Sequence, residues 1–385
     1  MSNFVESRGD WYCIVCNYQT NGRAWSHGLG ISSDQRVVKS QRTVGQCSRC
    51  GHIQVLLTAA WRRETASLYD SYKAYALSEG KEQKVFSSDT TPPTLRSEKL
   101  VLRLLQEVGR GARWLDFGAG DGTLLSTIAH HDASAHLEAF DVSDHNKDEV
   151  EARCDLKKFH SNLAEIETGF DVIVLSHVLE HLQDPIEEAL QLSHLLKTQG
   201  LIAIQVPNLE KNPFDMLVFD HVSHFTPRTL EIFASRLTSS FEINVDLYPK
   251  EIVALLTFAE QKLRAPHDVL PTSNHGRVLP VHEVVLRLDA AAASALTAKQ
   301  SASTLGVFGT STAAVWCAEL FDGSFDFWVD EDESRIGKAF MGLPVVAPDS
   351  IPARSLVVVP FVETLASRLA NRLISESSGS LLAIV

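Results

Sequence analysis

The seven residues 116–122, DFGAGDG, constrain the fold of this chain more than any other segment. They follow the short apolar run 112–117, and a helix-like stretch, 123–129, comes directly after them. Glycines at such a turn let the backbone approach a nucleotide-like ligand closely, and the helix presents free N–H groups and the positive end of its dipole. The segment therefore predicts a strand–turn–helix unit at a ligand site. Taken alone, it also fits a dinucleotide fold or a plain tight turn.

Further strands are predicted after this unit. The apolar segment 136–140 ends at Asp141, where an acidic residue after the second strand can accept both hydroxyls of a ribose. A third segment ends near Ser161 and Asn162, and the continuous apolar run 170–176 is typical of a central parallel strand. Carboxyl ends of parallel strands share one edge of a sheet, where ligands bind. One site is therefore expected to collect Asp116, Gly118, Gly120, Asp141, Ser161, Asn162 and His177.

The segment after the fourth strand contains a helix start. Asp184 is a good N-cap and Pro185 a good first helical residue, and apolar side chains recur at helical spacing as far as Leu196. Residues 197–200 are expected to end this helix, and 201–208 predict another strand.

Residues 112–208 resemble a class I S-adenosylmethionine (SAM) dependent methyltransferase. The resemblance rests on three features: DFGAGDG at 116–122, Asp141, and HVLEHLQDP at 177–185. The resemblance implies a Rossmann-like α/β core and SAM as cofactor. It places Asp116 and the glycines beside the methionine part of SAM and Asp141 at the ribose. The adenine would be bordered by Ser161, Asn162 or Leu163.

Four cysteines form two CxxC pairs, Cys13 with Cys16 and Cys47 with Cys50. Two such turns supply four thiolates to one ion with no open position, which is typical of a structural zinc site. A redox pair or two disulfides are the competing interpretations. We therefore predict an N-terminal zinc-binding domain with a helical extension, over residues 1–90.

The order of the whole chain resembles the zinc-containing sugar C-methyltransferases of deoxysugar biosynthesis. In that family an acid and a histidine before an aromatic residue are associated with deprotonating the carbon beside a keto group of a nucleotide sugar, and Asp220 and His221 occupy that place. His221 is the expected base, because methylation of carbon requires a carbanion or enolate. The enolate oxygen would be held by His181, by His224, or by a tyrosine, of which Tyr69, Tyr72 and Tyr75 are candidates.

The C-terminal third repeats the strand, small-residue turn and helix at 305–311, with further strands near 325–329 and 355–359. It is expected to be a second Rossmann-like α/β domain, over 266–385, behind a methyltransferase domain over 91–265. Gly309, Ser311 and Asp330 stand where a nucleotide would be bound, but a scaffold that encloses the neighbouring site is the favoured interpretation.

Composition limits the partners. The formal net charge of −13 disfavours nucleic acid as substrate, and no stretch approaches the ~20 apolar residues that cross a bilayer. A cytoplasmic enzyme acting on a small molecule, most specifically a nucleotide-linked keto sugar, is expected. The alternatives are O-methylation with the same base, an NAD(P)-dependent oxidoreductase that uses the C-terminal domain, and a zinc-ribbon nucleic-acid binder.

Overall fold

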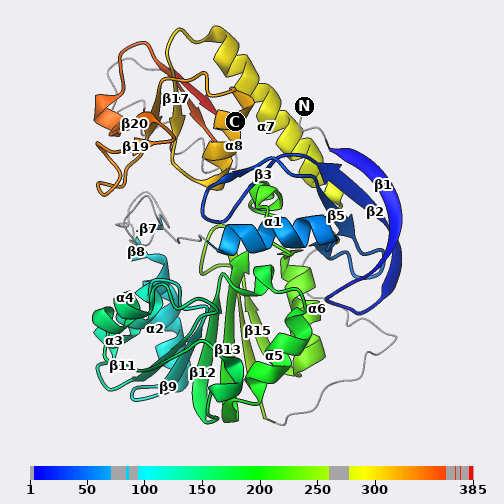
Figure 1. Ribbon diagram of the computed structural model, residues 1–385, viewed down its shortest axis with the longest axis vertical. Coiled ribbons are helices and arrows are strands. Elements are labelled where there is room, and N and C mark those ends of the chain that lie inside the picture. The colour runs from blue at the N-terminus through cyan, green and yellow to red at the C-terminus, as the bar shows by residue number, and fades with distance from the viewer. Residues whose placement is uncertain are drawn as a thin grey trace.

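The computed structural model describes residues 4–70, 84–85, 94–259, 277–360, 369, 373 and 381–384. Three larger sheets dominate it: one of seven strands, one of six and one of five. Figure 1 shows the seven-stranded sheet in green and cyan at the bottom, the six-stranded sheet at the top, and the N-terminal strands with α1 between them. The domain boundaries expected near 90 and 265 fall outside the described residues.

The seven-stranded sheet has the order β11-β10-β9-β12-β13-β16-β15. Its first five strands run parallel to one another; β16 is antiparallel to β13, and β15 is antiparallel to β16. The strands are β9 (Arg113–Phe117), β10 (His136–Phe140), β11 (Leu156–His160), β12 (Phe170–Ser176), β13 (Leu196–Pro207), β15 (Ser240–Asn244) and β16 (Glu251–Phe258). The strands predicted at 112–117, at 136–140, near 161 and at 170–176 are confirmed.

Helices cover both faces of this sheet (Figure 1). They are α2 (Arg96–Val108), α3 (Thr123–His131), α4 (Lys147–Arg153), α5 (Pro185–Ser193) and α6 (Pro227–Leu237), with 3-10 turns η2 (Leu163–Glu165), η3 (Leu179–His181) and η4 (Pro213–Leu217). The predicted cap is confirmed, because the Asp184 side chain accepts from the backbone N–H of Glu187 and Pro185 begins α5. Thr226 and Thr229 form a capping box that begins α6.

One element boundary was wrong. The helix was expected to run to Leu196, but α5 ends at Ser193 and β13 already begins at Leu196. Phe170 pairs with Leu196, whereas Val172 pairs with Leu201, so β13 carries extra residues at this point. Gln199 has a φ of 65° there. Leu195 and Leu196 continue the helical spacing of the apolar residues before them, so the pattern does not mark the change to a strand.

The five-stranded sheet has the order β1-β2-β5-β6-β14. Its N-terminal strands are β1 (Val5–Tyr12), β2 (Gln19–His27), β5 (Arg42–Gln46) and β6 (Ile53–Val55), and a short pair, β3 (Gly30–Ile31) and β4 (Val37–Val38), lies beside them. The fifth strand, β14 (Ser223–His224), comes from the middle of the chain. The helical extension is α1 (Ala59–Tyr69), which leads toward the short pair β7 (Lys84–Val85) and β8 (Thr94–Leu95).

The six-stranded sheet has the order β19-β20-β18-β17-β21-β22. It contains β17 (Leu305–Phe308), β18 (Phe327–Val329), β19 (Ala339–Phe340), β20 (Leu343–Val346), β21 (Leu356–Val359) and β22 (Leu381–Ile384), with α7 (Val281–Ser301), α8 (Thr312–Leu320) and η5 (Pro348–Ser350). All its pairings except β19 with β20 are parallel. The predicted strand–turn–helix unit at 305–311 is confirmed.

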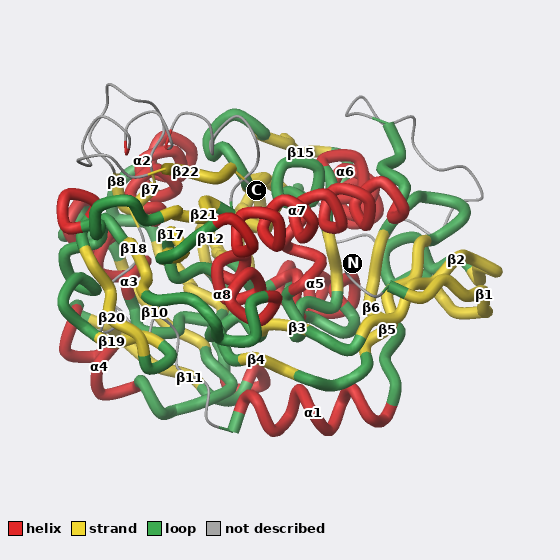
Figure 2. The backbone as a smooth tube through the Cα atoms, turned by 90° about the horizontal axis from the view of Figure 1, so that it is seen from above, coloured by secondary structure: helices red, strands yellow, loops and turns green. Residues whose placement is uncertain are grey.

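One hydrophobic core joins three parts of the chain. Trp25 and Trp61 from the N-terminal part, Phe219 from the central part, and Trp316 from α8 belong to the same buried cluster. The rings of Phe214 in η4 and Trp316 lie 5.8 Å apart. Figure 2 shows α7 and α8 lying over this region, above β3. The segment between β13 and α6 is therefore enclosed by both flanking parts.

No helix among the described residues is long and apolar enough to span a membrane.

Candidate active site

The glycine turn joins β9 to α3 in a conformation that requires glycine. Gly118 and Gly122 have φ values of 84° and 79°, in the left-handed region that side chains disfavour. A Cβ atom on Gly118 would also lie 2.5 Å from a methyl group of Val178, which follows β12. The turn therefore packs directly against the segment at 177–181, and the sequence pattern identified it correctly.

Asp141 follows β10 and fixes the turn. Its Oδ2 accepts a hydrogen bond of 3.0 Å from the backbone N–H of Gly120, and its Oδ1 accepts one of 3.0 Å from Ser143. Burial raises the pKa of Asp141, and backbone hydrogen bonds partly offset this effect. The carboxylate stands at the expected edge of the sheet, beside the glycines.

Asp116 is buried in the centre of β9. Burial, together with the neighbouring Asp141 and Asp121 carboxylates, raises its pKa to about 8. A carboxyl group in such surroundings stays protonated near neutral pH unless a cation approaches it. The site therefore has a place for a positively charged ligand group at the end of β9.

The other expected cofactor residues stand at the same sheet edge. Ser161 and Asn162 are exposed after β11, and the Asn162 Oδ1 accepts from the N–H of Ala164. His177 follows β12 with a φ of 57°. Its two ring nitrogens have protein partners: Nδ1 lies 3.1 Å from Glu180 and Nε2 lies 3.2 Å from Arg96.

His177 belongs to an ion network at the end of β12 and β13. Burial and Arg96 lower its pKa, but Glu251 and Glu180 outweigh them and raise the pKa to about 9. Arg96 Nε also lies 3.0 Å from Glu251, and Gln205 donates to the same carboxylate. A charged imidazole held in this way is suited to fixing the segment that follows β12.

A histidine cluster lies beside that segment. Asp215 in η4 accepts hydrogen bonds of 2.8 Å from Nδ1 of His221 and from Nδ1 of His224. All three side chains are buried. Burial would raise the pKa of Asp215, but the two histidines lower it far below its usual value. The hydrogen bond to Asp215 places a proton on Nδ1 of His221, so its Nε2 carries the lone pair.

The Asp220 carboxylate is held by the N-terminal part of the chain. Asp220 does not bond its neighbour; it accepts from the backbone N–H of Ser33 at 2.8 Å and from the Ser33 hydroxyl at 2.5 Å. Its Oδ2 lies 3.6 Å from Nδ1 of His181. The carboxylate that bonds His221 is therefore that of Asp215, six positions earlier in the sequence.

His181 is brought next to His221. The two rings are nearly perpendicular, with centroids 4.7 Å apart. Nδ1 of His181 lies 3.0 Å from the Tyr69 hydroxyl at the end of α1 and 3.1 Å from the carbonyl oxygen of Asp220. Tyr69 thus contacts His181, whereas Tyr72 and Tyr75 lie outside the described residues.

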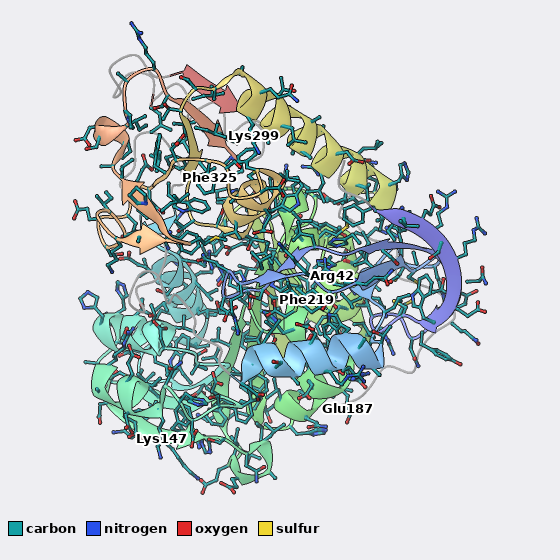
Figure 3. All side chains as sticks on the ribbon, turned by 45° about the horizontal axis from the view of Figure 1, so that its top comes forward. Arg42, Lys147, Glu187, Phe219, Lys299 and Phe325 are labelled. Atoms are coloured by element: carbon teal, nitrogen blue, oxygen red, sulfur yellow. The ribbon has the colours of Figure 1, made fainter. Side chains whose placement is uncertain are left out.

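The N-terminal part holds the segment that carries these histidines. Arg42 is buried and donates to the carbonyl oxygens of Met216 and Val218, and its guanidinium lies 6.0 Å from the Phe219 ring (Figure 3). The indole N–H of Trp61 donates to the carbonyl oxygen of Phe219 at 3.0 Å. Strand β6 pairs with β14, which contains His224. The candidate base therefore depends on contacts from two parts of the chain.

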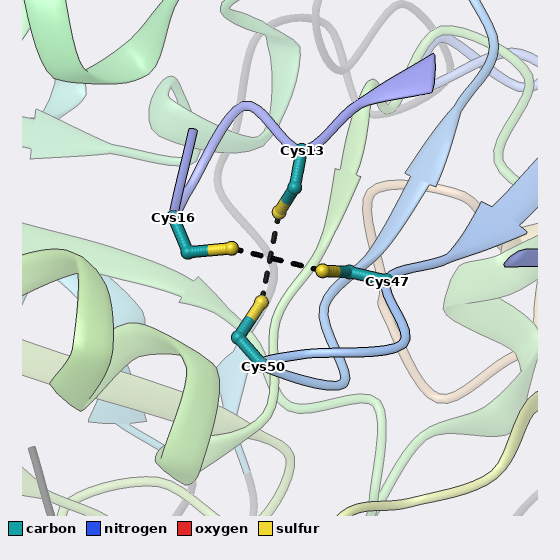
Figure 4. A group of neighbouring side chains, drawn as sticks. All are labelled: Cys13, Cys16, Cys47 and Cys50. Atoms are coloured by element: carbon teal, nitrogen blue, oxygen red, sulfur yellow. Dashed lines mark hydrogen bonds between the residues drawn. The ribbon is translucent and has the colours of Figure 1, made fainter. Parts of the chain in front are cut away.

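The four cysteine thiols converge on one point (Figure 4). The Sγ atoms of Cys13 and Cys50 are 3.6 Å apart, as are those of Cys16 and Cys47. Tetrahedral zinc with Zn–S bonds of about 2.3 Å requires sulfur separations of about 3.8 Å. The four side chains are buried and lie close enough together to hold one ion. The donor set fits a closed structural site, and His52 is bonded to Ser223 instead.

The polar side chains at the C-terminal turn bond one another. Ser311 caps α8 by accepting from the N–H of Ala314. Asp330, where a ribose acid was considered, lies 3.1 Å from the buried Arg335 guanidinium, which also donates to Thr310 at 2.8 Å. This arrangement supports the interpretation of the domain as a scaffold over its use as a nucleotide site.

Several residues that build the site were not identified from the sequence: Asp215, Glu180, Ser33, Arg42, Arg96 and Glu251. Glu180 stands three positions after His177 and next to His181, so its place after the fourth strand was a usable signal. Ser33, Arg42 and Asp215 reach the site through distant contacts that no local pattern marks.

Comparison with known proteins agrees with this geometry. A family model described as a methyltransferase domain matches residues 94–235. A search of curated proteins found no match. Among solved structures, plantazolicin methyltransferase BpumL in complex with SAH is similar over 42% of this chain and 82% of its own, with 16% identity and a TM-score of 0.36.

Two further structures are similar over comparable parts of the chain. The N-methyltransferase NodS from Bradyrhizobium japonicum WM9 in complex with SAH covers 42% of this chain and 86% of its own, with 16% identity and a TM-score of 0.33. Coclaurine N-methyltransferase bound to N-methylheliamine and SAH covers 48% and 63%, with 14% identity and a TM-score of 0.36. The family match assigns a methyltransferase domain to residues 94–235, the part of the chain that contains the glycine turn and its acids.

Proposed function

We propose that the protein methylates a small molecule, most specifically a carbon beside the keto group of a nucleotide-linked sugar, with His221 as the base. One observation carries this proposal: the segment 177–181 contacts both the glycine turn and the histidine cluster. Val178 packs against Gly118, and Glu180 accepts from the backbone N–H of Val222 through its carbonyl oxygen. A methyl group on SAM and an acceptor at His221 would therefore meet across this segment.

The chemistry follows from the orientation of His221. Its Nε2 takes the proton from the carbon beside the keto group, and the electron pair becomes an enolate. The enolate carbon then attacks the methyl group of SAM, the carbon–sulfur bond breaks, and S-adenosylhomocysteine leaves. His181, with Tyr69 on its other nitrogen, is placed to donate to the enolate oxygen. Asp215 stabilises the imidazolium that forms.

The cysteine cluster is proposed as a structural zinc site. Its four thiolates leave no open position, so the ion would stabilise the fold and take no part in chemistry. Cys47 and Cys50 precede β6, the strand that pairs with β14. The zinc would therefore support the wall of the site that carries His224.

Two experiments test the proposed function. Calorimetric titration with SAM, and with NAD as a control, is expected to show micromolar SAM binding and no response to NAD. Incubation with nucleotide-linked keto sugars and S-adenosylhomocysteine in deuterated water should then exchange the C–H beside the keto group without methyl transfer. Methylation of a hydroxyl without any such exchange would replace C-methylation with O-methylation, and NAD binding without SAM binding would overturn the proposal.

Removing the Asp141 carboxylate is expected to weaken SAM binding. Loss of hydrogen bonds to a charged group costs about 1.5–3 kcal/mol, which is roughly a 10- to 150-fold increase in Kd. Asp141→Ala is compared by calorimetry with Asp141→Asn, which keeps an acceptor for Gly120 but removes the charge. An unchanged Kd in Asp141→Ala would remove this residue from the cofactor site.

SAM binding is also expected to depend on pH through Asp116. Its pKa is about 8 in the free protein, and the ammonium group of a bound SAM favours the charged carboxylate. Binding below this pH therefore releases a proton, and affinity falls by up to about tenfold per pH unit as the pH decreases. Calorimetry in two buffers of different ionisation enthalpy measures the proton release. Asp116→Asn should abolish this component and leave only the titration of the SAM amine.

A further inference from the structure

Three side chains beside the glycine turn bring together one carboxylate and two imidazoles. Glu180, His181 and His221 each offer a ligand atom, and the three atoms lie within 4.8 Å of one another. Metal bonds near 2.1 Å require ligand separations of about 3–3.5 Å. The three ligand atoms would meet that requirement if they moved about 1 Å closer together, and rotation of their side chains permits such a shift.

Each of the three side chains has its other polar atom already engaged. His221 uses Nδ1 for Asp215, His181 uses Nδ1 for Tyr69 and the carbonyl oxygen of Asp220, and Glu180 uses Oε1 for His177. Metal ligands are usually oriented in this way by hydrogen bonds on the far side of each ligand. The atoms that remain available to a ligand are Nε2 of each histidine and Oε2 of Glu180.

The Glu180 oxygen is the independent sign that a ligand belongs here. Glu180 has no exposed surface, and its Oε2 has no hydrogen-bond partner in the described part of the chain. A buried, unsatisfied carboxylate oxygen is costly, by about 1–3 kcal/mol or more for a charged group. A cation placed between it and the two imidazoles would satisfy it.

The charge around the cluster also favours a cation. Three buried carboxylates, those of Glu180, Asp215 and Asp220, lie around the two imidazoles, and the buried Arg42 guanidinium interacts with the last two of them. His177 is shared between Glu180 and Glu251. The three carboxylates exceed these two cationic side chains by one charge, so the cluster favours a further cation.

We propose that Glu180, His181 and His221 form a second metal site, distinct from the cysteine site, which takes a divalent transition-metal ion such as Zn²⁺ or Co²⁺ and blocks methyl transfer while it is occupied. Imidazole and carboxylate ligands suit these ions. The blocking effect rests on the proposed function, because the ion takes the Nε2 lone pair that His221 uses as a base. The binding itself does not rest on it.

Cobalt titration of the full-length, zinc-loaded protein tests the site. Co²⁺ in the site should give visible d–d bands for one ion per chain, without the near-ultraviolet thiolate band that exchange into the cysteine site would produce. Glu180→Gln and His181→Asn should weaken cobalt binding by at least about 100-fold, and Asp215→Asn by about 10- to 100-fold, because the last residue only orients a ligand.

His282→Ala is the matched control, because His282 is an exposed histidine on α7; it should bind cobalt as the parent protein does. Thermal unfolding of each variant shows whether it is folded. Absence of the d–d bands in the parent protein, or bands unchanged in both ligand variants, would overturn the site. Cobalt binding that leaves deuterium exchange unaffected would overturn the blocking effect, whereas exchange that is absent even in chelator-treated protein would count against the proposed function alone.

Discussion

A His221→Ala variant is expected to bind SAM with nearly the affinity of the parent protein and to lose about 10²- to 10⁴-fold in the rate of methyl transfer. The reason is the separation of the two halves of the site. The acids and glycines at the cofactor edge follow β9 and β10, whereas His221 lies between η4 and β14 and bonds Asp215. The measurements are kcat with the keto sugar that shows exchange, and the calorimetric Kd for SAM.

Two variants control this result. Asp215→Asn keeps an acceptor near His221 but removes the charge that stabilises its imidazolium, so kcat should fall with little change in the Kd for SAM. His136→Ala replaces an exposed histidine at the start of β10 and should change neither quantity. All assays use protein with one zinc ion per chain, confirmed by metal analysis, so that His221 holds no ion. If His221→Ala loses SAM affinity as strongly as Asp141→Ala does, His221 belongs to cofactor binding and the proposed role is wrong.

The cofactor edge of the site could be predicted from the sequence because its determinants are local. Gly118 and Gly122 need positive φ, Asp141 follows a short apolar strand, and parallel strands bring their carboxyl ends to one edge. Each of these features appears within a few residues of the chain. Strand order along the chain therefore sufficed to place the acids beside the glycine turn.

The catalytic half could be predicted only in part. His181 and His221 were identified by resemblance, but their partners come from distant segments. Asp215 lies in η4 and accepts a hydrogen bond from His221. Ser33, which is 187 positions away from Asp220 in the sequence, donates to the Asp220 carboxylate. A pairing over such a separation depends on packing between parts of the chain, which no local periodicity records. The sequence therefore did not identify Asp215 as the hydrogen-bond partner of His221.

At the C-terminal turn, a local sequence pattern was present but did not decide whether the turn binds a nucleotide. Gly309, Ser311 and Asp330 satisfied the local pattern of a nucleotide site, since the strand, turn and following acid are all present. Only the structure shows that the Arg335 guanidinium donates a hydrogen bond to the Asp330 carboxylate. A local pattern can therefore predict the backbone of a binding turn correctly while leaving open whether the turn is vacant.

Replacement of Cys13 and Cys16 by serine is expected to have the largest effect on stability. Two of four thiolates are then lost, and zinc should no longer be retained. Structural zinc contributes an apparent free energy of about 10–16 kcal/mol in small zinc-binding units, so the β1–β2–β5–β6 sheet should lose its cooperative unfolding. Metal content by plasma emission and thermal unfolding by calorimetry measure the two effects. Cys154→Ser is the control, because Cys154 is half-buried and far from the cluster in sequence.

Loss of zinc should also lower the rate of methyl transfer. Arg42 and Trp61 hold the carbonyl oxygens of 216–219, and β6 holds β14, so a loosened N-terminal sheet releases the segment that carries His221 and His224. Phe117, at the start of the glycine turn, packs in the core that contains the cysteines, but Ala119 in the turn packs with Leu124 and Leu125 in a different core. Methyl transfer should therefore fall much further than SAM affinity in the Cys13→Ser/Cys16→Ser protein. A variant that is free of zinc, unfolds as the parent does and turns over normally would show that the cysteine cluster supports neither the fold nor the base.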